Sequence, residues 1–285
     1  MKKIMALILA AMMFGGNAFA SFTVAAPLGS DNISSIDDTA LTQNTALSNT
    51  LGGLTGWQNL AVTYTSAASV TITADSLYLQ QTSNISYRST SVSEVATITT
   101  SGASGLVTSL SEASSTWYYI YIARKSSDGT TNAFLSTSAV VATALGQLDA
   151  GYDQLALVSA VRNDGSSNFI DFKQYDREWF YSSEVIMQSG AAGGSPVSAS
   201  TAAFIPSGIS QKIKFSWHLV NNGSLFVSNI NSSALNAIGT IAANSTGTYA
   251  QGEFNLLTAD TLWFSGASGT ENNIYCRGFT VTKLG

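Results

Sequence analysis

Apolar and polar residues alternate with a period of two over most of the chain that follows Trp57. Leu60, Val62 and Tyr64, for example, alternate with smaller or more polar neighbours. This alternation is typical of strands that bury one face. The further strands that the pattern predicts are 70–73, 77–79, 93–99, 117–123, 133–136, 155–161, 169–175, 179–187, 213–220, 225–229, 249–257, 261–265 and 274–282.

Turn-forming dipeptides lie between several of these strands. Asp128-Gly129, Asp164-Gly165 and Asn222-Gly223 accept the positive φ angles of tight hairpins, so they predict antiparallel neighbours. Between the strands we find no helical pattern of the length that a parallel sheet with crossover helices requires. The sequence therefore predicts an all-β fold, with two antiparallel β-sandwich or jelly-roll-like modules after an N-terminal arm.

Changes in composition divide the chain. Residues 1–20 combine two Lys, an apolar run and Ala-Phe-Ala, which predicts a cleaved secretory signal; an apolar segment buried among copies in an assembly is the alternative. The polar residues 21–56 predict an attachment arm, and residues 57–188 a central module. The small-residue run 189–200 predicts a linker, after which residues 201–285 form a C-terminal module.

Composition excludes several functions. The 285 residues include 42 Ser and 30 Thr, whereas only 10% are charged and the net charge is −5. No basic block is present that could neutralise a nucleic-acid backbone. With 1 His and 1 Cys, a zinc cluster, a Cys/His protease and a disulfide scaffold are excluded. Asp31, Asp37 and Asp38 lack the Gly and terminal Glu of a calcium loop, so we expect no metal and no cofactor.

Three positions could carry chemistry, and for each the structural interpretation is favoured. His218 falls on the polar face of a strand without a nucleophile motif. Asp176 and Glu178 would lie on one strand face, about 7 Å apart, as a minor candidate for a glycosidase pair. Cys276 follows Ile274 at strand spacing, which predicts a buried thiol. We therefore expect no enzymatic activity.

Aromatic residues gather in two stretches. Both faces of the first stretch are bulky, which predicts a central strand in an aromatic core; exposed platforms for saccharide rings are the alternative. The residues concerned are Trp117, Tyr118, Tyr119 and Tyr121 in the first stretch, and Tyr175, Trp179, Phe180 and Tyr181 in the second.

A set of motifs resembles a module that recurs in tailed-phage virion proteins of the fibre and tail type. The resemblance covers about residues 54–187, although 139–150 lacks the prolines that usually precede Gly-Tyr in such modules. It implies a structural or attachment protein and supplies no catalytic residues. The motifs are Trp117-Tyr-Tyr-Ile-Tyr-Ile122, Ser127-Asp-Gly129, Leu135-Ser-Thr-Ser138, Gly151-Tyr152, Leu157-Val-Ser-Ala-Val-Arg-Asn-Asp-Gly-Ser166 and Phe169.

The resulting expectation is a fibre-like virion protein that recognises a host-surface glycan or protein. We expect a homo-oligomer, with a trimer favoured, attached to other virion proteins through its arm. A secreted bacterial adhesin or carbohydrate-binding protein is the first alternative, and a surface-polysaccharide hydrolase is the second. The expected recognition residues lie in or beside loops of the C-terminal module: Asn222, Ser224, Asn244, Thr246, Tyr249, Asn272 and Tyr275.

Overall fold

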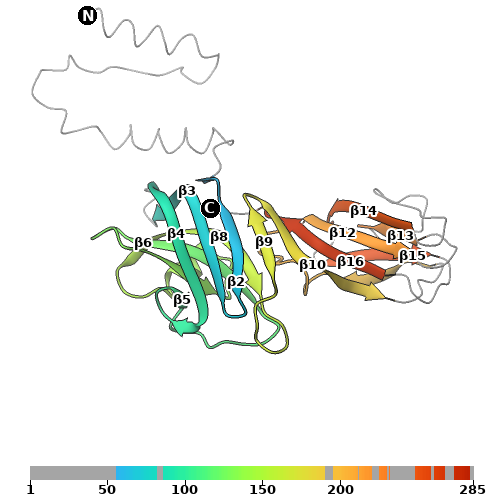
Figure 1. Ribbon diagram of the computed structural model, residues 1–285, viewed down its shortest axis with the longest axis horizontal. Coiled ribbons are helices and arrows are strands. Elements are labelled where there is room, and N and C mark those ends of the chain that lie inside the picture. Colours follow the sequence, from blue (N-terminus) through green and yellow to red (C-terminus); the bar gives the residue numbers. More distant parts are fainter. Residues whose placement is uncertain are drawn as a thin grey trace, which may run out of the picture. The chain divides into compact units, whose positions relative to one another are not determined.

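In the computed structural model, the described residues, which are coloured along the chain in Figure 1, all fall within the range 48–285. The predicted secretory segment and the predicted arm up to residue 55 lie outside them, as do parts of the C-terminal loops. The described residues are 56–81, 86–189, 195–210, 212–219, 225–229, 231, 248–257, 260–266 and 273–282.

Strands make up most of the described structure, which confirms the predicted all-β class. Among the described residues the one helix is the short α3 (Val141–Leu145). The strands are β1 (Trp57–Gln58), β2 (Ala61–Ser66), β3 (Ser69–Gln81), β4 (Ser86–Ser101), β5 (Gly105–Leu106), β6 (Trp117–Lys125), β7 (Thr131–Ser136), β8 (Tyr152–Arg162), β9 (Phe172–Tyr175), β10 (Glu178–Ser189), β11 (Val197–Ser200), β12 (Lys212–Leu219), β13 (Leu225–Ser228), β14 (Thr248–Asn255), β15 (Thr261–Gly266) and β16 (Asn273–Thr280).

Six of these strands close into a barrel in the order β3-β4-β5-β7-β6-β8. The end of β3 closes the ring, because Gln80 pairs with Leu155 of β8. The aromatic strand β6 lies between β7 and β8 and is buried from Tyr118 to Ala123. This confirms its predicted central position.

The sheet continues beyond the barrel through β2, β9, β10, β16, β12 and β14. A separate sheet of β11, β15 and β13 contributes Leu262 and Phe264 to the same hydrophobic core. Strand β10 is the junction, since one edge pairs with β9 and the other with β16 (Figure 1). The C-terminal strands therefore extend the sheet that also forms the barrel.

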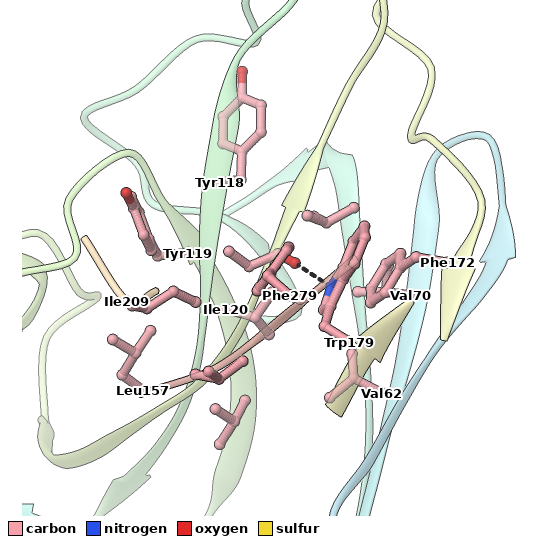
Figure 2. Packing of buried hydrophobic residues seen from close by; sticks show 14 of the residues in the cluster. Val62, Val70, Tyr118, Tyr119, Ile120, Leu157, Phe172, Trp179, Ile209 and Phe279 are labelled. Atoms are coloured by element: carbon pink, nitrogen blue, oxygen red, sulfur yellow. Dashed lines mark hydrogen bonds between the residues drawn. The ribbon is translucent and has the colours of Figure 1, made fainter. Parts of the chain in front are cut away.

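An aromatic cluster lies beneath this junction. Trp179 of β10 stacks on Phe172 at 4.7 Å and on Phe279 of β16 at 4.5 Å between ring centroids (Figure 2). Its indole Nε1 donates a hydrogen bond to the carbonyl oxygen of Ala160 at 3.1 Å. Trp117 of the barrel contacts both Trp179 and Phe279 edge-on. One cluster thus joins side chains from the barrel, from β9–β10 and from the C-terminal strands.

The segment 201–210 also packs against the barrel and β10. The Trp117 indole donates to the carbonyl oxygen of Ala202 at 2.9 Å, and the Tyr181 hydroxyl donates to that of Phe204 at 2.8 Å. Ile209 is fully buried. The division of the chain into two modules at 189–200 stays a prediction. These hydrogen bonds join residues on either side of that segment. The described end of the predicted linker forms strand β11.

The predicted hairpin at Asp128-Gly129 is confirmed between β6 and β7, with Gly129 at φ 82°. The one at Asp164-Gly165 is confirmed only as a short antiparallel turn, and the one at Asn222-Gly223 is wrong. Strands β12 and β13, on either side of Asn222-Gly223, lie in different sheets and do not pair. After β8, one isolated bridge joins Asn163 to Phe169, and β9 pairs with β2 and β10 instead. Local turn chemistry could not predict these pairings, because they depend on which distant strand competes for each edge.

Candidate functional site

Of the seven predicted recognition residues, the structure describes two, Tyr249 and Tyr275. Asn222, Ser224, Asn244, Thr246 and Asn272 lie outside the described residues. Tyr249 lies in β14, opposite His218 of β12. Tyr275 of β16 is half-buried, and its hydroxyl accepts a hydrogen bond from Asn273 Nδ2 at 3.2 Å. Their role in recognition stays a prediction.

Cys276 is fully buried in β16, as its spacing from Ile274 predicts. Burial raises the pKa of the Cys276 thiol to about 12, and its Sγ lies 3.7 Å from the carbonyl oxygen of Gly278. A thiol held protonated in this way is a poor nucleophile.

Asp176 does not extend a strand together with Glu178, so that part of the prediction is wrong. It lies in the β9–β10 turn at φ 51°, where its Oδ1 accepts a hydrogen bond from the Leu60 amide at 3.2 Å. Glu178 begins β10 and forms an ion pair with Lys214, and the Thr280 hydroxyl donates to its Oε1 at 3.4 Å. Each carboxylate thus has a structural partner.

Both carboxylates nevertheless line a pocket of about 680 Å³, which we call the tyrosine pocket. It is formed by β1, β3, β4 and the β9–β10 turn, and it combines aromatic, amide, hydroxyl and charged groups. The lining residues are Trp57, Gln58, Asn59, Ser76, Tyr78, Arg88, Asp176, Arg177 and Glu178.

Strand register explains how distant residues reach this pocket. Gln58 pairs with Ser76, and Tyr78 pairs with Arg88, so these four side chains share one face of β1, β3 and β4. Tyr78 is 40% exposed although its neighbours Leu77 and Leu79 are buried. The exposed ring of Tyr78 thus adds an aromatic face to the wall of the pocket.

The β9–β10 turn forms the opposite wall. Arg177 lies with its guanidinium carbon 5.2 Å from the ring centroid of Trp57, and its Nη1 donates to the carbonyl oxygen of Val281 at 3.3 Å. At the β1 end, Asn59 adopts a φ of 53°, and its side-chain amide donates to Asp75 Oδ2 at 2.6 Å. These bonds hold the wall side chains in place before any ligand arrives.

The charges of the tyrosine pocket balance. The lining contains two arginines, Arg88 and Arg177, and two carboxylates, Asp176 and Glu178. The pocket lining therefore favours neither an anionic nor a cationic ligand. In the part of the chain that the structure describes, no group of three or more His, Cys, Asp or Glu could hold a metal ion. The pocket thus offers hydrogen-bond donors and acceptors around an exposed aromatic ring.

The outward position of Tyr78 could have been predicted from the alternation of its strand. Tyr78 stands between Leu77 and Leu79, so strand alternation places its ring on the face opposite these two leucines. A single tyrosine is a weaker signal than the aromatic stretches around Trp117 and Trp179. The contribution of the β9–β10 turn depends on long-range pairing and has no local signal.

Comparison with known proteins gives no relative: no family model, curated protein or solved structure matches the chain. Within the described ranges, no helix has the length and apolarity needed to cross a membrane.

Proposed function

We propose that this chain is a fibre-like attachment protein of a phage virion and that the tyrosine pocket binds a neutral saccharide of the host surface. The observation that carries the saccharide part is the exposed ring of Tyr78 beside a pocket of about 680 Å³ with balanced charges. This proposal puts saccharide binding at the tyrosine pocket, and recognition by the C-terminal loops stays a separate prediction.

Saccharide chemistry fits this lining. A sugar ring presents an apolar face, which packs on an aromatic side chain, and a rim of hydroxyls that both donate and accept hydrogen bonds. Gln58, Asn59 and Ser76 supply neutral groups of both kinds, while Arg88 supplies donors. A few polar groups arranged around a preformed hollow are the usual way in which proteins orient small ligands.

The virion part rests on the resemblance of the aromatic motifs and on composition. Those motifs occupy β6, β7 and β8 of the barrel, and a chain with 10% charged residues and many Ser and Thr suits polar pairing between adjacent subunits. In this proposal the chain forms a homo-oligomer, with a trimer favoured, and residues 21–56 attach it to other virion proteins.

Glycan-array binding by the full chain tests the saccharide part. We expect neutral glycans to bind, and Tyr78→Ala to weaken that binding about tenfold through loss of one aromatic contact. The matched control is Tyr87→Ala, because Tyr87 is also 40% exposed but pairs with Leu79 and so projects from the opposite face of β3–β4. Equal losses in both variants, or no neutral ligand, would contradict the assignment.

A secreted adhesin would use the same pocket but would not be assembled into particles. An antibody against the chain should therefore detect it in purified virions, at a constant ratio to the other particle proteins. Detection in culture medium alone, with virions free of the protein, would favour the adhesin.

A polysaccharide hydrolase is the second candidate, because Asp176 and Glu178 line the same pocket. Release of reducing sugar from host polysaccharide, abolished separately by Asp176→Asn and by Glu178→Gln, would establish it. We expect no release, since the Leu60 amide and Lys214 already engage these carboxylates.

A further inference from the structure

A second hollow, of about 330 Å³, lies on the C-terminal strands; we call it the lysine hollow. It borders β10, β12, β14 and β16. Its lining residues are Phe180, Lys214, Phe215, Gln251, Gly252, Glu253 and Arg277. Phe180 is 37% exposed, so this hollow also has an aromatic ring that the core does not use.

The two hollows adjoin along one strand. Glu178 lines the tyrosine pocket and Phe180 lines the lysine hollow, and residues two apart on a strand share a face about 7 Å from each other. Lys214 links them, because its ammonium group pairs with Glu178 and lies 4.6 Å from the centroid of the Phe180 ring.

Gly278 makes this arrangement possible. It lies opposite Phe180 on one side and opposite Lys214 on the other, at φ 153°. A Cβ atom there would lie 2.0 Å from the carbonyl oxygen of Trp179. The absent side chain thus lets β16 approach the backbone of β10 closely beside Phe180.

Ion pairs neutralise the charged groups around the lysine hollow. Lys212 pairs with Glu253, and Lys214 pairs with Glu178 and, at 3.5 Å, with Glu253. Arg277 Nε lies 3.3 Å from Glu184 Oε1. Each of the three cations thus has a carboxylate partner, although Glu178 also lines the tyrosine pocket, so the two hollows together hold one more cation than carboxylates.

The outer face continues past the lysine hollow toward Tyr275. Ser216 of β12 and Ile186 of β10 both lie opposite Tyr275 of β16. Ile186 is 54% exposed, and Tyr275 is half-buried. A ligand that leaves the lysine hollow in this direction would meet a further apolar and aromatic surface.

We propose that the lysine hollow is a second saccharide subsite, so that one extended neutral glycan chain runs from Tyr78 across Phe180 toward Tyr275. This inference rests on the proposed saccharide binding at the tyrosine pocket. Two small hollows on one face, each with an exposed ring and paired charges, fit successive units of a polymer better than two separate small ligands.

Binding of neutral and acidic oligosaccharides of graded length, from monomer to hexamer, tests this subsite. For a series that the full chain binds, affinity should rise with length. Phe180→Ala should remove about tenfold from the affinity of the longest members and leave the shortest unchanged, whereas Phe180→Tyr should retain the gain. Binding should also change little with salt, because the charges are already paired.

Every other outcome would contradict a specific part of the proposal. The second subsite would be contradicted if affinity did not increase beyond the shortest oligosaccharide bound. It would also be contradicted if the increase with length persisted in Phe180→Ala. Either result would leave the proposed binding at the tyrosine pocket intact. Binding of acidic members alone, falling steeply with salt, overturns the neutral ligand at both sites. No binding across the set, by a chain whose circular dichroism shows a folded β protein, overturns the saccharide function and this inference with it.

Discussion

The two faces of β10 use consecutive aromatic residues in different ways. On the inner face, Trp179 is 1% exposed and stacks between Phe172 and Phe279. On the outer face, Phe180 is 37% exposed and lies under the ammonium group of Lys214. The inner face joins the barrel to the C-terminal strands, while the outer face presents rings and paired charges to solvent.

Because the two faces of β10 differ in burial, substitutions on one face should disturb stability and those on the other should leave it nearly unchanged. A side chain in the core loses buried contacts when it is truncated, whereas one on the outer face loses only the area that it covers. Substitutions on the inner face should therefore act on folding, and those on the outer face on binding.

The largest effect should come from cutting the chain after β10. A chain of residues 48–189 lacks β16 and with it the Phe279 ring, and it exposes the edge of β10. We expect it to lose cooperative urea unfolding, whereas residues 48–285 retain it. Cooperative unfolding of residues 48–189 with a native-like near-ultraviolet spectrum would instead establish two independent modules.

Trp179→Ala should destabilise the protein by about 3–5 kcal/mol, the usual cost of removing a large buried aromatic side chain. The loss includes the hydrogen bond to Ala160 as well as the stacked rings. Phe180→Ala is the matched control and should cost less than about 1 kcal/mol, because surface changes are usually small. Urea denaturation measures both, and similar losses would show that the two faces are not distinct.

The alternating pattern predicted the class of the fold and the inward faces of single strands. In β12, Ile213, Phe215 and Trp217 are fully buried, as their spacing predicts, and Cys276 is buried as well. These positions could be predicted because side-chain periodicity along a strand depends only on the order of neighbouring residues.

Strand partners were less accessible to sequence analysis. Asn222-Gly223 is a strong hairpin signal, yet β12 pairs with β14 and β16. The closed barrel depends on the pairing of β3 with β8, and the tyrosine pocket on the proximity of Trp57 to Arg177. Such contacts join residues far apart in the chain, so they reflect competition among all strand edges rather than any local pattern.

Gly278→Ala should have an intermediate effect on stability, because β16 packs closely against the backbone of β10 at this position. The added Cβ would meet the carbonyl oxygen of Trp179 and the Cα of Phe180, so either the strands separate or the backbone leaves its φ of 153°. We expect a loss of about 1–3 kcal/mol, as for other overpacked sites. Urea denaturation provides the measurement, with Gly165→Ala as the control, since a Cβ there meets nothing within 4 Å. Equal losses would contradict the close approach at Gly278.

Replacing Cys276 should have the smallest effect on stability at neutral pH. The effect of the thiol on the free energy of unfolding should appear only at alkaline pH. Its pKa is raised by burial from an ordinary value of 9.0 to about 12. Between these values the unfolded chain releases the thiol proton while the folded chain keeps it, so the free energy of unfolding should fall as pH rises. The free energy of unfolding of Cys276→Ala should fall less steeply over the same interval, because this variant lacks both the buried thiol and its contribution to the raised pKa of Tyr181. A thiol reagent should also label the native protein at neutral pH only as fast as it unfolds. Rapid native labelling, or identical alkaline slopes in the two proteins, would show that the inner face is open at β16.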